Sequence, residues 1–176
     1  MTSHELVSRV RESPDHNRCD LTRLLADAAS FSSVVSRLAE PFHSRRIELV
    51  AALEAGGFAL GGAVASRLQA GLVLIRKPGK AAWQSIAQEF DDYEHECGSF
   101  HIVSDAILPG QRVLLVDDWS ETGGQAFAAI QLLERAGAVI VGAAFINLEE
   151  RVRNDSRFKS YQLHAVLDYG AHVDPK

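Results

Sequence analysis

The chain has 176 residues, of which 47% are hydrophobic and 23% are charged. This composition is typical of one globular domain and unlike that of disordered or fibrous proteins. Lysine and arginine number 18 against 23 aspartate and glutamate, a net charge of -5, which argues against a general nucleic-acid-binding protein. The two cysteines, Cys19 and Cys97, lack the spacing of a zinc site, and one pair does not make a disulfide scaffold.

The first residues are charged throughout, so we expect no signal peptide. The longest uncharged apolar stretch, residues 136–148, is too short to cross a bilayer. We therefore expect a cytoplasmic protein with no membrane segment. Because no repeat or linker divides the chain, we predict a single domain over residues 1–176, in which residues 1–30 form an N-terminal extension.

The first half of the chain predicts a helix followed by strand, helix and strand. Apolar residues recur at helical spacing over residues 31–42, which predicts an amphipathic helix. Residues 47–53 predict a strand, 58–69 a helix and 71–75 a second, buried strand. Residues 81–98 show no clear period and predict a long loop.

The second half continues this alternation. Residues 100–103, 113–116 and 139–146 predict strands, and residues 123–136 predict a helix between the last two strands. Strands that alternate with helices are typical of a parallel sheet covered on both faces. The sequence therefore predicts an α/β fold, with a parallel β-sheet flanked by helices.

The segment after the strand at 113–116 is the first candidate site. It reads Asp117-Asp118-Trp119-Ser120-Glu121-Thr122-Gly123-Gly124, and ligands bind outside the carboxyl ends of such strands. Glycines at the start of a helix suit a phosphate, and paired carboxylates suit sugar hydroxyls or magnesium. Alternatively, the acids simply end a strand and Ser120 or Thr122 caps the helix. The spacing alone does not decide between these interpretations.

The same segment resembles the signature of the type I phosphoribosyltransferases, in which an apolar strand, two acids and a TGG-type loop follow one another. Further stretches resemble adenine phosphoribosyltransferases in the same order: Gly57-Phe58 and residues 76–80, 93–98 and 105–110. The resemblance implies the fold of that superfamily with a mobile lid loop. It also implies transfer of a 5-phosphoribosyl group from phosphoribosyl diphosphate to a nucleobase, with magnesium as cofactor, in a homodimer.

The resemblance implies a role for individual residues. Asp117 and Asp118 match the acids at the ribose hydroxyls and, directly or indirectly, at magnesium. The loop that cradles the 5′-phosphate corresponds to Glu121, Thr122, Gly123, Gly124 and Gln125. The diphosphate side corresponds to Gly56, Gly57, Arg76, Lys77 and Lys80. Glu96 matches a glutamate implicated in proton transfer. Without the resemblance, the basic stretch is more typical of a solvated turn and Glu96 of an exposed loop acid.

The chain also departs from the adenine enzymes. Gly56 and Cys19 stand where those enzymes carry arginines near the pyrophosphate and the adenine, and Gln125 replaces a threonine. Glu121 replaces a small residue, and it resembles the loop aspartate that the hypoxanthine-guanine branch holds near purine N7. Glu121 is therefore a second candidate catalytic residue, and Trp119 and Cys19 are candidate base contacts, although a tryptophan that fills the core is equally compatible with the sequence.

Two functions are compatible with these residues. The first is a purine-type phosphoribosyltransferase, in which adenine or another purine-like heterocycle is the acceptor. The second is a non-catalytic module that senses phosphoribosyl diphosphate or a nucleotide, which the altered positions Gly56 and Glu121 favour. Glu96 and the basic stretch, which both remain, favour the enzyme.

Overall fold

A computed structural model describes residues 1–12, 19–79, 84–91 and 97–168 of the chain. Two predicted site residues, Lys80 and Glu96, lie outside these ranges, as do residues 80–83 and 92–96 of the expected lid. Within the described ranges, no helix is long and apolar enough to span a membrane.

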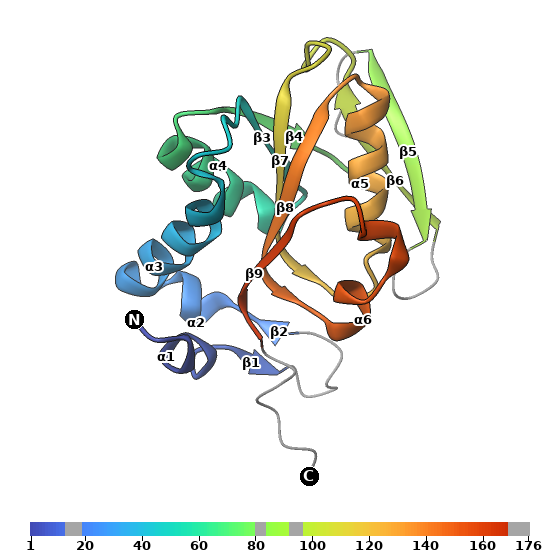
Figure 1. The fold of residues 1–176 in the computed structure, drawn as a ribbon. Helices are drawn as coiled ribbons and strands as arrows, with labels where there is room; N and C mark the ends of the chain where they lie inside the picture. Colours follow the sequence, from blue (N-terminus) through green and yellow to red (C-terminus); the bar gives the residue numbers. More distant parts are fainter. Residues whose placement is uncertain (13–18, 80–83, 92–96, 169–176) are drawn as a thin grey trace.

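Five parallel strands form the central sheet, which confirms the predicted α/β class (Figure 1). In spatial order they are β4 (Gly71–Ile75), β3 (Leu49–Leu53), β7 (Arg112–Ser120), β8 (Val139–Leu148) and β9 (Leu163–Leu167). Each neighbouring pair is parallel. In Figure 1, the long strands β7 and β8 run downward, so that their carboxyl ends lie in the lower half of the molecule.

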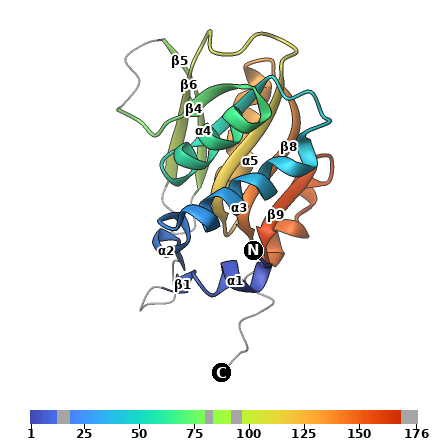
Figure 2. The same cartoon turned by 90° about the vertical axis from the view of Figure 1, so that its left-hand side faces the viewer.

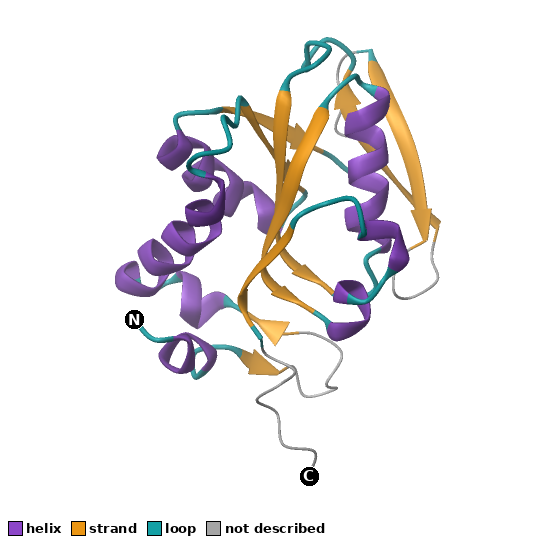
Figure 3. Ribbon diagram, viewed as in Figure 1, coloured by secondary structure: helices purple, strands orange, loops and turns teal. Residues whose placement is uncertain are grey.

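Helices cover both faces of the sheet (Figures 2 and 3). Helices α3 (Ala28–Ala39) and α4 (Gly56–Leu68) lie on one face, and α5 (Gly124–Arg135) lies on the other. Because successive strand residues point to opposite faces, Leu114 packs in the core cluster below α3 and α4, whereas Leu115 packs in the cluster below α5. Both leucines are fully buried, as expected for a strand covered on both sides.

The predicted loop over residues 81–98 is wrong for the part that the structure describes. Strand β5 (Ser85–Asp91) pairs antiparallel with β6 (Cys97–Val103), and this hairpin packs on α5. Ile86, Gln88 and Phe90 occupy the more buried alternate positions of β5. The polar Gln88 interrupts the apolar pattern, but its side-chain oxygen accepts a hydrogen bond from Arg135 of α5 at 2.9 Å.

The N-terminal extension contributes α1 (Ser3–Val7), β1 (Arg11–Glu12), β2 (Cys19–Asp20) and α2 (Thr22–Leu25). Leu6 and Leu24 are fully buried and join the cluster below α3 and α4. The predicted helix at 31–42 is α3, continued by the short 3-10 helix η1 (Glu40–Phe42). The short elements α6 (Glu150–Arg153) and η2 (Ser156–Phe158) connect β8 to β9.

Candidate active site

A cleft of about 330 Å³ opens at the carboxyl ends of the central strands. It is lined by Cys19, Glu54, Ala55, Gly56, Lys77, Asp117, Asp118, Trp119, Ser120, Glu121, Thr122, Gly123, Gln125 and Ala126. Among the described residues, the structure thus brings together most of the predicted site. Gly57, Gly124 and Arg76 do not line the cleft. Gly57 packs behind Asp117, Gly124 begins α5, and the Arg76 guanidinium lies 5.8 Å from the centre of the Phe58 ring.

The two acids lie within a strand and not in the loop that follows it. Strand β7 extends to Ser120, beyond the predicted end at residue 116, and it stays paired with β8 as far as Leu148. Asp117 is buried, with only 9% of its surface exposed. Burial, and then the negative charge of Asp118, raise the pKa of the Asp117 carboxyl well above its usual range. Asp118 accepts a hydrogen bond at 2.7 Å from the backbone N–H of Trp119.

The first turn of α4 meets both carboxylates. A side chain at Gly56 would overlap the Asp118 carboxylate, so glycine makes room for that acid at the N-terminus of a 13-residue helix. A helix N-terminus favours negative charge. This contact gives a physical reason for glycine at position 56, where the adenine enzymes carry an arginine. The Asp118 carboxylate occupies the space that a larger residue would need.

Gly57 is confined by backbone as well as by a side chain. A Cβ atom there would lie 2.9 Å from the Val116 carbonyl oxygen and 2.8 Å from Asp117 Oδ1. Because the first of these is backbone, it cannot rotate away, so we expect Gly57→Ala to lower the free energy of unfolding by about 1–3 kcal/mol. Urea denaturation measures this change.

Gly62 provides the matched control in the same helix. A Cβ atom there would have Leu72 Cδ2 as its nearest neighbour, at 3.9 Å. Gly62→Ala is therefore expected to leave stability unchanged or to raise it by up to about 1 kcal/mol through helix propensity. If the two variants were equally stable, α4 would not pack against β7 as closely as described.

A second wall of the cleft begins after β3. The side chain of Glu54 accepts a hydrogen bond at 2.8 Å from the backbone N–H of Lys77, which ties the end of β3 to the turn after β4. This contact holds Lys77 at the cleft. A lysine there gives the predicted diphosphate side a positive charge.

The predicted phosphate loop joins β7 to α5. Gly123 has a φ of 76°, in the left-handed region that glycine adopts without strain. The Thr122 hydroxyl accepts a hydrogen bond at 3.3 Å from the backbone N–H of Gly124, the first residue of α5. Backbone N–H groups at the start of a helix form a site for an anion.

Trp119 is held at the cleft by residues of β8 and the turn after it. Its indole Nε1 donates to Glu149 Oε1 at 3.3 Å, and the Asn147 side-chain amide donates to the same oxygen at 3.4 Å. Trp119 and Asn147 are register partners in β7 and β8. Sequence reasoning missed Asn147 and Glu149, although both come soon after the strand predicted over residues 139–146, which is the signal that singled out Asp117. It also missed Glu54.

The acid pair fits magnesium only together with a substrate. Within the described ranges, no group of three or more His, Cys, Asp or Glu side chains could hold a metal ion. Asp117 and Asp118 offer carboxylate oxygens, which magnesium prefers, and magnesium is commonly bound by one or two carboxylates together with substrate phosphates and water. The donor set therefore suits an ion that arrives with a diphosphate.

Comparisons with known proteins agree with this geometry. The sequence matches the phosphoribosyl transferase domain family over residues 25–176. An adenine phosphoribosyltransferase of Rhodopseudomonas palustris (strain HaA2) is 42% identical over 179 residues, which cover 97% of each protein. The crystal structure of adenine phosphoribosyltransferase from Rhodothermus marinus DSM 4252 matches with a TM-score of 0.87 and 34% identity, over 94% of this chain and 97% of that one. The enzyme from Saccharomyces cerevisiae, in complex with adenine and an imino-altritol bisphosphate, matches with a TM-score of 0.84 and 25% identity, over 94% of this chain and 98% of that one. The chain therefore belongs to the type I phosphoribosyltransferase family.

Proposed function

We propose that the protein transfers a 5-phosphoribosyl group from phosphoribosyl diphosphate to adenine or a closely related purine, giving a nucleoside monophosphate and pyrophosphate. One observation carries this proposal: the acid pair, the glycine-containing loop and Trp119 line the same cleft. Such a reaction belongs to purine salvage. The identity to an adenine phosphoribosyltransferase over 97% of both proteins supports adenine as the base.

Each part of the cleft has a chemical task in this reaction. The N–H groups of the phosphate loop bind the 5′-phosphate, and the Asp117 and Asp118 carboxylates accept hydrogen bonds from the ribose hydroxyls. Transfer passes through an oxocarbenium-like state at ribose C1, as in other glycosyl transfers. Carboxylates near that carbon stabilise its positive charge. Lys77, which lines the cleft, would contact the diphosphate as it leaves.

Magnesium is part of the same proposal. Asp118, and less directly the more buried Asp117, are the residues that would hold it. When bound, the ion neutralises negative charge on the diphosphate and so makes it a better leaving group. We further propose a cytoplasmic homodimer, which the family resemblance supports. Light scattering should then give about twice the chain mass of 19.2 kDa.

Pyrophosphate release tests the function directly. The purified full chain is incubated with phosphoribosyl diphosphate, magnesium and, in turn, adenine, hypoxanthine, guanine and uracil. We expect turnover with adenine to be fastest. Binding of AMP without turnover of any base would overturn the proposed enzyme and favour the non-catalytic sensing module. If the folded protein neither bound AMP nor turned over any base, both functions would be excluded.

Glu121 is proposed to select the base. A carboxylate near a purine accepts from a ring N–H but repels a ring lone pair. We expect Glu121→Ala to change the ratio of kcat/KM for adenine over hypoxanthine on the order of tenfold, with little change in KM for the sugar diphosphate. Steady-state kinetics with both bases measure the ratio.

The competing role for Glu121 is structural. An acid just before α5 also stabilises the N-terminus of that helix. In that case, Glu121→Ala would lower the melting temperature slightly and leave the ranking of bases unchanged. Measuring Tm and base ranking on the same variant separates the two roles, with Glu121→Gln as a control of similar size.

A further inference from the structure

Two arginines hold the outer side of the phosphate loop. Arg151 Nε donates a hydrogen bond at 2.6 Å to the carbonyl oxygen of Glu121. A terminal guanidinium nitrogen of Arg157 donates at 3.1 Å to the carbonyl oxygen of Thr122. Neither arginine is among the residues that line the cleft, although Glu121 and Thr122 are. Two successive carbonyl groups of the loop therefore point toward the arginines and out of the cleft.

Arg157 is itself fixed from several sides. The Asp155 carboxylate accepts hydrogen bonds from Arg157 Nε at 2.7 Å and from its backbone N–H at 2.8 Å, and it forms an ion pair with the terminal nitrogen at 2.6 Å. The guanidinium carbon lies 5.3 Å from the centre of the Phe127 ring and 5.9 Å from that of Phe158. These contacts leave the guanidinium little freedom, although the residue is at the surface.

The direction of the carbonyls determines the direction of the amides. In a planar trans peptide the N–H points away from the C=O of the same group, and no cis bond occurs in this loop. The N–H groups of Thr122 and Gly123 belong to the two peptide groups whose carbonyls the arginines bind. They therefore point away from the arginines, toward the cleft that both residues line. A hydrogen bond to the carbonyl also polarises the peptide and makes its N–H a stronger donor.

We propose that Arg151 and Arg157 are positioning residues that set the affinity of the cleft for the 5′-phosphate, by orienting and polarising the N–H groups of Thr122 and Gly123. Neither arginine touches the substrate. The inference rests on the proposed function, which places a 5′-phosphate in this loop. It predicts that replacing either arginine weakens the binding of ligands that carry a 5′-phosphate and has little effect on ligands that have only the base and the sugar.

Binding of AMP and of adenosine, which differ only in the 5′-phosphate, tests this prediction. Calorimetry is carried out on the full chain and on Arg151→Met, Arg157→Met and the double variant. We expect each single change to weaken AMP binding about five- to tenfold, and adenosine binding less than about twofold. Arg157→Lys keeps the charge but not the planar fork, so it should restore AMP affinity only in part.

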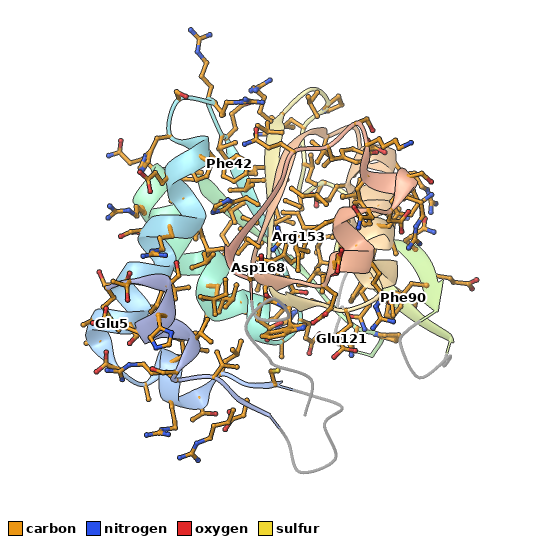
Figure 4. The ribbon with its side chains drawn as sticks, turned by 60° about the horizontal axis from the view of Figure 1, so that its bottom comes forward. Glu5, Phe42, Phe90, Glu121, Arg153 and Asp168 are labelled. Atoms are coloured by element: carbon orange, nitrogen blue, oxygen red, sulfur yellow. The ribbon has the colours of Figure 1, made fainter. Side chains whose placement is uncertain are left out.

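Arg153→Met is the matched control. Arg153 lies in the same segment and also donates to two backbone carbonyls, but these belong to Leu148 and Leu167, both at 3.3 Å. Its guanidinium lies 3.9 Å from the Asp168 carboxylate. Figure 4 labels Arg153 and Asp168 next to each other, away from Glu121. Arg153→Met is therefore expected to leave the ratio of AMP to adenosine affinity unchanged.

The outcomes distinguish the inference from the proposed function. Equal losses of AMP and adenosine affinity in the arginine variants would mean that the arginines serve only stability, which overturns the inference but leaves the function. If the wild-type chain bound neither AMP nor phosphoribosyl diphosphate, the proposed function itself would be overturned, and the inference with it. If Arg157→Met does not fold, Asp155→Asn loosens the same guanidinium. A selective loss of AMP affinity then supports the inference, and an unchanged ratio overturns it.

Discussion

Asp117→Asn is expected to make the protein more stable at neutral pH and much less active. The Asp117 carboxyl is buried beside a second acid, and burial first and the charge of Asp118 second raise its pKa well above the usual range. Its ionised form therefore costs stability in the folded state. Asparagine keeps the shape and can still accept the hydrogen bond from the Gly57 N–H, without the charge.

The pH dependence has a definite sign. A carboxyl whose pKa is higher in the folded state stabilises the fold fully below its unfolded pKa of about 4. That contribution is lost as the pH rises through the folded pKa. The melting temperature of wild type should therefore fall below that of Asp117→Asn as the pH rises from about 4. Thermal unfolding at a series of pH values measures the difference.

Asp155→Asn is the control of opposite sign. The Arg157 side chain, through its hydrogen bond, lowers the pKa of Asp155. Such a group stabilises the fold above its unfolded pKa, and this stabilisation is lost as the pH falls through its folded pKa. Asp155→Asn should therefore be less stable than wild type at pH 7, and the difference should shrink in acid.

The activity of Asp117→Asn should change in the other direction. In the proposed function, Asp117 accepts hydrogen bonds from the ribose hydroxyls. Hydrogen bonds to a charged acceptor contribute about 1.5–3 kcal/mol, so we expect kcat/KM to fall roughly 10- to 100-fold. A variant with wild-type kinetics would show that Asp117 is not at the sugar. A variant less stable than wild type at pH 7 would show that the carboxylate has stabilising partners beyond those described.

Trp119→Ala is expected to raise KM for adenine roughly 5- to 150-fold, because stacking on an aromatic side chain contributes about 1–3 kcal/mol per base. Trp119 lines the cleft, and Glu149 fixes the edge of its indole. KM for phosphoribosyl diphosphate should change little. Initial-rate kinetics with each substrate varied in turn give both constants.

Trp119 also packs against the core cluster below α3 and α4. Its removal will therefore lower stability as well, by up to about 3–5 kcal/mol. Trp119→Phe retains a stacking surface and loses the hydrogen bond to Glu149, so it should keep most of the adenine affinity. Equal rises of both KM values in Trp119→Ala would indicate a collapsed cleft and no specific contact with the base.

The central sheet could be predicted because its strands are apolar on both faces and are separated by helices. Residues 71–75, 113–116 and 139–146 show this directly in their composition. Residues 100–103 of β6 could be predicted as a strand, but β5 and the start of β6 could not, because the partner of Gln88 is Arg135, 47 residues away along the chain. A polar side chain that finds its partner only in the folded state looks like a loop residue in the sequence.

The cleft likewise combines residues that a local sequence pattern identifies with residues that only folding brings together. Asp117, Asp118 and the phosphate loop are contiguous, so a local pattern identifies them. Glu149 reaches Trp119 only through the pairing of β7 with β8. Arg151 and Arg157 reach the loop only because the segment after β8 folds back over it. The positions of residues that support other site residues depend on packing and strand register, and a linear sequence motif contains neither.

The contact between Gly56 and Asp118 constrains how this cleft can change by mutation. A larger residue at position 56 overlaps the Asp118 carboxylate as it lies now, so the effects of changing either position depend on the residue at the other. A cation introduced at position 56 must displace the Asp118 carboxylate, which the proposed function places at the ribose. The order in which the two positions change therefore determines whether the intermediate protein keeps its activity.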